Sequence, residues 1–578
     1  MTGATVEAGR APAERTATPQ LVGRSVGTGA LWSALNAGTL RVATFAVSLV
    51  AARLIAPHDF GVFTVAVTVF NVAMSFAELG VSSAIVREHE RSRELGPTAF
   101  TLSLANAGLL AGLMVIFAPT LARQLGSAEA TEAVRVLALF VLLAGFSAVP
   151  SALMTRDFMQ RQRFIIDAAF LVSSTAAMIV LVLMGHPVMG LAVSRVAGQV
   201  VTVVMITWMA PERYWPGFRW RVAKPLLAFG VPLAGANLLM MVIANVDFAV
   251  VGHLLGPRQL GYYNLAFGIA GWPVTIFSAV LIAVTLPTLS RVRNSPGELT
   301  RHLTAGLSAV TALSFPVCAL CAVLAGPLID TVYGTRWHPA WTALVVLSIF
   351  GAARTVLTLF SDLAIALGLT RRLFAIQVAW LVVLVPTMVV CVERWGIAGA
   401  GVAHAAVVTL LVIPLYVMLT KRATPVRIAA VRDALLPPLG GSLCAAAAAY
   451  AATLAVDGSL AKLLLGLVAG LLVYALVAGR WLKSLRRRLN DMYWRKDGEA
   501  AVAGPAASAA PAEAVDAVAT STASPRPSRA RGRHAYGAAN FSVEELRRRH
   551  EAAVAIPFAD APTERIWLSQ AITAEIRK

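Results

Sequence analysis

The feature that most constrains this chain is a series of apolar runs of about 20 residues, which recur from Leu31 to Trp481. A helix of that length rises about 1.5 Å per residue, so it crosses the roughly 30 Å apolar core of a bilayer. Strands of a membrane β-barrel are shorter and alternate apolar with polar residues, whereas these runs do not alternate. The runs therefore predict an all-α polytopic membrane protein.

We place about fourteen spans along the chain by this criterion, joined by short connections. Only 14% of the residues are charged, against about 25% in an average soluble domain, so too few charges remain to cover a water-exposed surface. The expected spans begin near Leu31, Phe60, Thr98, Val134, Phe164, Val188, Pro225, Leu260, Leu303, Pro339, Arg372, Ile397, Ala434 and Leu460.

Basic residues alternate between the expected loops. Loops after even-numbered spans hold clusters of arginine and lysine, whereas the other loops hold mostly one basic residue each. Because basic loops stay on the cytoplasmic side, this pattern predicts a plasma-membrane protein with both termini in the cytoplasm. The net charge of +19 is spread over many short loops and does not form one patch, so we expect no nucleic-acid partner. The clusters include Arg87, Arg91 and Arg93; Arg156, Arg161 and Arg163; and Lys421, Arg422, Arg427 and Arg432.

An internal repeat is visible at an offset of 200 residues. The segment Arg-Leu-Ile-Ala-Pro-His-Asp-Phe-Gly-Val-Phe from Arg53 returns as His-Leu-Leu-Gly-Pro-Arg-Gln-Leu-Gly-Tyr-Tyr from His253. Each copy falls between the first two spans of a six-span set. We expect proline to end the helix and glycine to permit a tight outer turn. We favour a structural role for Arg53, because the end of a span lets its side chain reach water. The recurrent prolines and glycines are Pro57, Gly61, Pro257 and Gly261.

The repeat predicts two six-helix lobes in the same orientation, related by an axis along the membrane normal. Two further spans follow them, and a linker rich in Ala, Pro, Ser and Gly begins at about residue 497. Short amphipathic helices after the linker would either bind a cytoplasmic partner or form a solvated or membrane-surface tail. The expected parts are an N-terminal tail (1–28), two lobes (29–220 and 221–420), a pair of spans (421–484) and a C-terminal tail (485–578).

The turn that begins at Arg53, set between a first and a second span, resembles the polysaccharide exporter family. That family belongs to the superfamily that also contains multidrug extruders and the lipid II flippase. The resemblance covers about residues 25 to 490 in span number, orientation and repeat. It implies two lobes that rock around a central cavity and move undecaprenyl-diphosphate-linked sugars to the outer leaflet. It also implies membrane lipids and other polysaccharide-assembly proteins as partners.

Ionisable residues inside the spans are candidates for function because a charge is costly in the apolar layer. Arginine suits a diphosphate because its planar donors match phosphate oxygens. Arg41 either binds the anionic head group or pairs with Glu78 or a helix carbonyl. Arg354 either serves substrate or forms a salt bridge with Asp362, two turns further on. The candidates for substrate binding are Arg41, Glu78, Arg195 and Arg354.

Coupling to an ion requires a carboxylate, and Asp247 and Asp362 are the candidates. Asp247 would bind a proton or Na⁺, or else serve as a satisfied structural carboxylate. We interpret His404 as a packed histidine. Cys318 and Cys321 lie in an apolar run without a second pair, so we expect helix packing and no metal or cofactor.

Two other functions compete with a flippase. A cation-coupled multidrug extruder of the same superfamily is the nearer one, although arginine candidates suit an anionic substrate better. The other is a membrane enzyme that transfers, polymerises or ligates lipid-linked sugars. The short outer loops hold no paired-carboxylate motif for acid–base work, and no glycine-rich phosphate loop indicates use of ATP, so we expect no enzyme.

Overall fold

The computed structural model describes residues 43–77, 92–157, 159–212, 214–291, 296–423 and 428–493, together with residue 39. The chain divides into two units, Met1–Val502 and Ala503–Lys578, and the described residues all belong to the first. The predicted linker and amphipathic helices of the C-terminal tail lie outside the described residues.

Every regular element among the described residues is a helix, as the apolar runs predict. Eleven of these helices are long and apolar enough to cross a membrane, and a shorter apolar helix covers Ala43–Leu54. A polytopic α-helical membrane fold is therefore confirmed. The helices are α2 (Pro57–Ala77), α4 (Ser92–Gln124), α5 (Thr131–Arg156), α6 (Gln160–Leu183), α7 (Pro187–Met209), α8 (Trp220–Arg291), α9 (Pro296–Val323), α10 (Ala325–Val332), α11 (Trp341–Ala366), α12 (Thr370–Val407), α13 (Ile413–Ala423), α14 (Ile428–Leu454) and α15 (Ser459–Tyr493), with short η2 (Ala128–Ala130), η3 (Thr335–Ala340) and π-helical η4 (Val408–Val412).

Two of the long helices contain a kink. Gly256 in α8 has φ 78° and Gly396 in α12 has φ 59°, both in the region that glycine adopts without a Cβ clash. These kinks lie just before Leu260 and Ile397, where the sequence predicts that new spans begin. Each of these helices therefore covers two of the expected spans.

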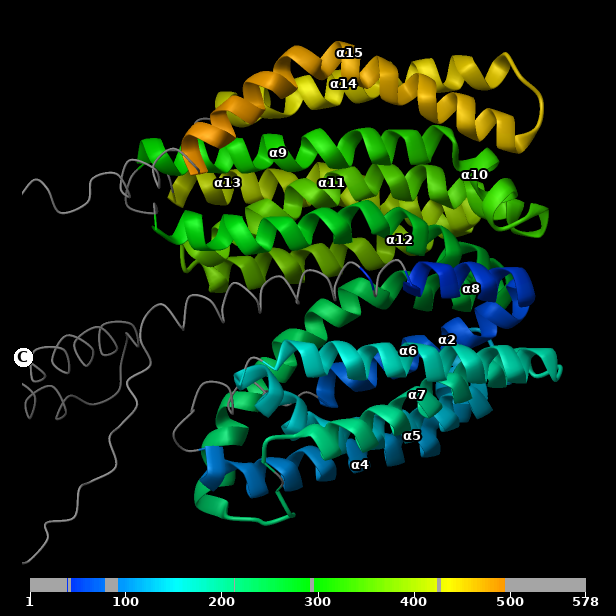
Figure 1. Cartoon of the computed structure of the whole chain (residues 1–578), viewed down its shortest axis with the longest axis vertical. Coiled ribbons are helices and arrows are strands. Elements are labelled where there is room, and N and C mark those ends of the chain that lie inside the picture. The colour runs from blue at the N-terminus through cyan, green and yellow to red at the C-terminus, as the bar shows by residue number, and fades with distance from the viewer. Residues whose placement is uncertain are drawn as a thin grey trace, which may run out of the picture. The chain divides into compact units, whose positions relative to one another are not determined.

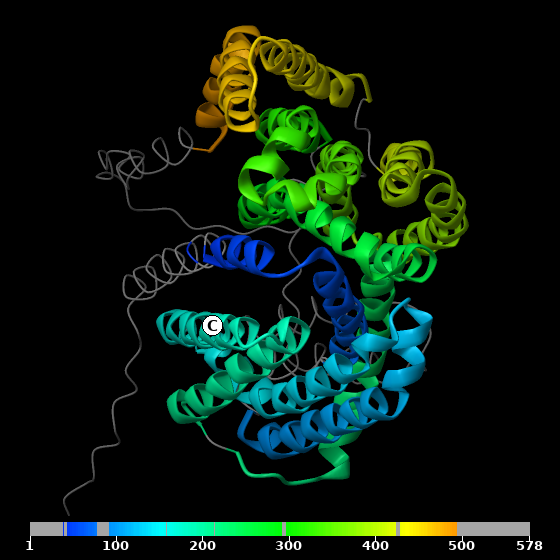
Figure 2. The same cartoon turned by 90° about the vertical axis from the view of Figure 1, so that its right-hand side faces the viewer.

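Helix α2 packs along α8 through the repeated glycines, and the blue α2 lies beside the green α8 in Figure 2. A Cβ at Gly61 would overlap the carbonyl of Pro257, and a Cβ at Gly261 would overlap that of Pro57. The expected turn role of the two glycines is wrong, because both lie inside helices. They are needed for the close approach of two backbones.

Helices α14 and α15 pack against α9, and Figure 1 shows the three running side by side. The Tyr474 hydroxyl of α15 donates to the Ala312 carbonyl of α9 at 2.7 Å. Gly470 faces Leu320 of α9 and the Ala445 carbonyl of α14, so a small residue lets the three helices meet. The last two spans are thus fixed to α9.

We expect Gly61→Ala to destabilise the fold by about 1–3 kcal/mol, because the added methyl overlaps the backbone of α8 and overpacking costs that much. Thermal unfolding of the purified protein in detergent measures the change. Gly268→Ala in α8 is the control, since no atom lies within 4 Å of the position that its Cβ would take. Equal unfolding midpoints for the two variants would contradict a tight contact at Gly61.

Candidate functional site

The largest cavity that we describe has a volume of about 740 Å³ and is formed by α2, α8, α11, α12 and α13. Its lining includes Ser75 near the end of α2, Asp362 near the end of α11 and Gln377 near the start of α12. These helix ends adjoin the basic loops of the sequence, so the cavity lies toward the predicted cytoplasmic side. The lining residues that bear charge or titrate are Asp247, Arg354, Asp362, Tyr416 and His404.

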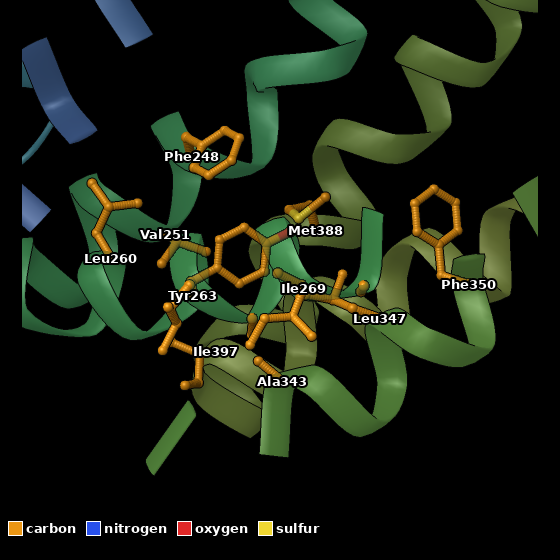
Figure 3. Close-up of a cluster of buried hydrophobic side chains, with 14 of the residues drawn as sticks. Phe248, Val251, Leu260, Tyr263, Ile269, Ala343, Leu347, Phe350, Met388 and Ile397 are labelled. Carbon is orange, nitrogen blue, oxygen red and sulfur yellow. The ribbon is translucent and has the colours of Figure 1, made fainter. Parts of the chain in front are cut away.

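Asp247 is the most enclosed charged residue of this cavity, with 1% of its surface exposed. The Tyr263 hydroxyl donates to its Oδ2 at 2.6 Å, and the Phe248 backbone N–H donates to its Oδ1 at 3.0 Å. Tyr263 lies beyond the Gly256 kink of α8, so the bend in the helix brings donor and acceptor together. Figure 3 shows the Tyr263 ring among apolar side chains that include Phe248, Val251 and Met388. The carboxylate therefore accepts two hydrogen bonds, and the ring of one donor is packed among apolar side chains.

His404 of α12 adds a titratable group that sequence reasoning assigned only to packing. Its Nε2 lies 3.5 Å from Asp247 Oδ2, and its ring stacks on Phe350 with centroids 4.6 Å apart. Both ring nitrogens lack a hydrogen-bond partner in the described part of the chain. Nothing in the local sequence of His404 signals this neighbour, because Asp247 is more than 150 residues away.

Arg354 and Asp362 line the same cavity from α11, yet no ion pair joins them among the described residues. The two residues are eight positions apart, which separates them by about 12 Å along a helix. Helical ion pairs need a spacing of three or four residues. The predicted salt bridge is therefore wrong, and both side chains remain available to the cavity. One Asp362 carboxylate oxygen is buried without a partner in the described residues.

Arg195 lies in a second cavity of about 450 Å³, formed mainly by α2, α6, α7 and α8. Its guanidinium carbon lies 5.4 Å from the centre of the Phe63 ring. This is the geometry of a cation–π contact, which stabilises a charge in an apolar place. Arg195 and Arg354 thus stand in different cavities and are not brought together.

The two cavities flank the contact between α2 and α8. Asn71 of α2 donates to the Asn245 side chain of α8 at 3.1 Å, and both line the smaller cavity. Met74, one turn along α2 from Asn71, and Met241, one turn along α8 from Asn245, line the larger one. Asn264 donates to Thr64 at 2.8 Å, and these two residues are 200 positions apart. Residues at equivalent positions of the repeat therefore touch.

The opposite end of these helices is closed by reciprocal hydrogen bonds. Arg53 donates to the Thr331 carbonyl at 2.9 Å and to the Val332 carbonyl at 2.8 Å, at the end of α10. Arg336 and Trp337 donate back to the Ala52 carbonyl at 2.7 and 2.8 Å. We call these four bonds the outer clamp. Arg53, for which we expected a structural role, is exposed and caps the carbonyls of another helix.

A similar contact lies at the position equivalent to Arg53. His253 Nδ1 lies 2.8 Å from the Gln124 carbonyl at the end of α4. Gly126, just after that helix end, meets the backbone of Gly252. The residues that begin the two copies of the repeat thus each contact the end of a helix that belongs to the other predicted lobe.

Arg41 and Glu78 lie outside the described residues, so their predicted roles stay predictions. In the larger cavity one arginine stands with two aspartates, and the smaller one holds Arg195. The lining of the larger cavity is therefore mixed in charge and not purely cationic. No cluster of three or more metal-binding side chains occurs in the part of the chain that the structure describes.

Several curated proteins are similar to this chain. The lipopolysaccharide biosynthesis protein WzxC of Escherichia coli is 21% identical over 395 residues, which are 68% of this chain and 80% of that protein. The succinoglycan biosynthesis transport protein ExoT of Rhizobium meliloti is 24% identical over 57% of this chain and 67% of its own length. A protein of Haloferax volcanii named "Probable flippase AglR" is 24% identical over 75% of this chain and 91% of its own. Two of these names describe transport or flipping, which agrees with a transporter and not with an enzyme.

Solved structures share the fold. A lipid II flippase MurJ in an inward closed conformation matches 77% of this chain and 99% of its own, with a TM-score of 0.64 and 16% identity. An inward-facing multidrug resistance transporter of the MATE family matches 65% of this chain and 94% of its own, with a TM-score of 0.54 and 17% identity. These likenesses support the polytopic helical architecture.

The model of one protein family matches residues 50–342, which include the repeated turns, the outer clamp and Asp247. Its description is "Polysaccharide biosynthesis protein". The match covers about half of the chain and agrees with the resemblance seen in the Arg53 turn. The chain therefore belongs to the polysaccharide biosynthesis protein family.

Proposed function

We propose that the chain is a flippase that moves undecaprenyl-diphosphate-linked oligosaccharide from the inner to the outer leaflet by alternating access of two lobes. The observation that carries this proposal is the cavity of about 740 Å³ with Arg354 and Asp247 in its lining. It lies toward the basic-loop side, while the outer clamp closes the other end. Family membership and relatives named for polysaccharide biosynthesis, transport and flipping support the same function.

The proposed architecture has about fourteen spans in two lobes, residues 29–220 and 221–420, with a further pair at 421–484. The contacts between equivalent residues support this repeat. In a pair of units related by a two-fold axis, equivalent residues touch only close to the axis. Gly61 with Gly261 and Thr64 with Asn264 meet this condition, and the contacts of Gly61 with Pro257 and of Gly261 with Pro57 are a reciprocal pair. An even number of spans, with the basic loops in the cytoplasm, would leave both termini on the cytoplasmic side of a bacterial inner membrane.

The diphosphate head group enters the larger cavity from the cytoplasmic side, and its lipid tail stays in the bilayer. Arg354 binds phosphate oxygens there, since a guanidinium gives two parallel donors and keeps its charge. Arg195 offers a second cation across the α2–α8 contact. Arg41 is the third proposed cation, and Glu78 is a further proposed substrate-binding residue. The lobes then rock about the α2–α8 contact and release the head group outside.

Coupling to an ion is proposed at Asp247, with Asp362 as the second carboxylate of the cavity. A proton or Na⁺ on Asp247 would neutralise the negative charge of the carboxylate. Without it, hydrogen bonds from the Tyr263 hydroxyl and the Phe248 N–H stabilise that charge. His404 at 3.5 Å is placed to share a proton with this carboxylate. Occupancy of Asp247 thereby changes the contacts between α8 and α12.

We expect Arg354→Gln to slow flipping by about 10- to 100-fold, because a hydrogen bond to a charged group contributes about 1.5–3 kcal/mol. A fluorescent undecaprenyl-diphosphate oligosaccharide in proteoliposomes measures the rate. Arg394→Gln is the control, since Arg394 is exposed beside the Gly396 kink of α12 and does not line the cavity. A folded Arg354→Gln variant that flips at the normal rate would remove Arg354 from the substrate site.

The same proteoliposomes test the flippase against its alternatives. A protein that flips no lipid-linked sugar, but exports a small cation under an ion gradient, is a multidrug extruder. Asp247 and Asp362 are the observation that favours this second candidate, because carboxylates bind cationic drugs. Glycosyl transfer or polymerisation of the lipid-linked sugar would identify a membrane enzyme.

Asp247→Asn is expected to abolish the response of transport to an ion gradient. Movement of the substrate between the leaflets without a gradient should continue. The amide keeps the size of the side chain and an oxygen for the Tyr263 hydroxyl, but it cannot take up a proton or balance Na⁺. Transport rates with imposed proton and Na⁺ gradients measure the effect. Asp457→Asn, at an exposed aspartate in the connection between α14 and α15, should leave the response unchanged. An unchanged response in Asp247→Asn would make this carboxylate structural.

Arg53→Gln is expected to loosen the outer end, since it removes donors from the Thr331 and Val332 carbonyls. The distance between spin labels placed on residues 54 and 335 reports the two sides of the clamp. We expect the distribution to broaden toward longer distances, whereas Arg258→Gln, at an exposed arginine of the other repeat copy, should not change it. Identical distributions would show that the Arg53 bonds are not needed to close the outer end, which the bonds of Arg336 and Trp337 to Ala52 would then hold.

A further inference from the structure

A separate pocket lies between α9, α14 and α15, away from both cavities described above. Its volume is about 600 Å³. The start of α9, the start of α14 and the last turns of α15 form the pocket. Each of these segments adjoins a basic segment of the sequence. The pocket therefore opens on the predicted cytoplasmic side. It is lined by Arg301, Thr304, Ala305, Ser308, Ala430, Asp433, Ala434, Pro437, Trp481, Leu485 and Arg488.

Two arginines from different helices face this pocket. Arg301 comes from α9 and Arg488 from α15, and both are exposed. The carboxylate of the pocket, Asp433, is already engaged by Arg432 at 2.9 Å. Neither Arg301 nor Arg488 forms an ion pair with a described residue, and Arg488 donates only to the Ser484 hydroxyl, at 3.2 Å. The pocket thus has an excess of positive charge whose natural counterpart is an anion.

The remaining wall of the pocket is apolar. Leu485 is buried at its base, and Ala305, Pro437 and the half-buried Trp481 add carbon surface beside it. A free anion gains nothing from such a wall, whereas an amphiphile places its head on the arginines and its hydrocarbon on the wall. Tryptophan next to arginine is typical of the depth at which head groups meet acyl chains. Basic pockets between spans on the cytoplasmic side suit anionic lipid head groups.

We propose that this pocket binds the phosphodiester head group of an anionic phospholipid of the inner leaflet. Arg301 and Arg488 contact the phosphate, Thr304 and Ser308 offer hydroxyls to the head group, and Trp481 with Leu485 receives the start of the acyl chains. The lipid joins α9 of the second lobe to the added pair α14 and α15. This inference does not depend on the flippase function, since the pocket lies apart from the transport cavities.

Native mass spectrometry of the full chain in detergent tests the pocket, with phosphatidylglycerol as the probe and phosphatidylcholine as the zwitterionic comparison. We expect phosphatidylglycerol to be retained in preference. The double variant Arg301→Gln with Arg488→Gln should weaken its binding on the order of tenfold or more, since each basic residue near a head group contributes about 1 kcal/mol. The control is Arg486→Gln with Arg487→Gln, which removes the same charge from exposed positions outside the pocket.

Each other outcome overturns the proposal. If both double variants lose phosphatidylglycerol binding to the same extent, the lipid is attracted to the basic surface in general and not to this pocket. No preference over phosphatidylcholine would mean that the pocket has no anion site. Displacement of the lipid by millimolar inorganic phosphate would assign the arginines to a free anion. Binding of undecaprenyl diphosphate but not of phosphatidylglycerol would make the pocket part of the substrate path. All four substituted arginines are exposed, so folding should persist in both variants.

Discussion

The close contact between α2 and α8 is the constraint on which the rest of the described structure depends. At Gly61 and Gly261 there is no space for even one carbon atom, so the two helix backbones set each other's position. Helices in a bilayer gain no hydrophobic free energy by association, and close approach of small residues replaces that driving force. Both cavities and the outer clamp are arranged around this line of contact. Equivalent positions of the repeat each contact a charged residue of a cavity: Phe63 packs on Arg195, and the Tyr263 hydroxyl donates to Asp247.

Three charged residues are stabilised here by different means. Arg195 lies over an aromatic ring, Asp247 accepts two hydrogen bonds, and the exposed Arg53 caps the last carbonyls of another helix. Arg195 and Asp247 each line a cavity as well. Arg354 differs, since it faces the cavity without an ion pair among the described residues. A group in that position suits a ligand that supplies the missing negative charge.

The sequence predicted the class of fold and the family, because these depend on local pattern. Run length placed new spans at Leu260 and Ile397, next to the glycines at which α8 and α12 bend. Asp247 and Arg354 were found as charges in apolar runs. Their neighbours were not found, because a run of apolar residues does not show how a helix is rotated about its axis. His404 and Tyr263 therefore gave no signal, and the spacing of Arg354 and Asp362 suggested a bond that helix geometry forbids. The repeat indicated two similar turns, but not that these would pack against each other.

The bond between Tyr263 and Asp247 spans the kink at Gly256, with nine residues on one side and seven on the other. It therefore acts as a brace across a hinge. While this hydrogen bond is present, the two halves of α8 keep one angle, and Gly261 stays in contact with the backbone of α2. We propose that a cation bound at Asp247 displaces the Tyr263 hydroxyl, which would remove this link and let the two halves of the 72-residue α8 change their angle.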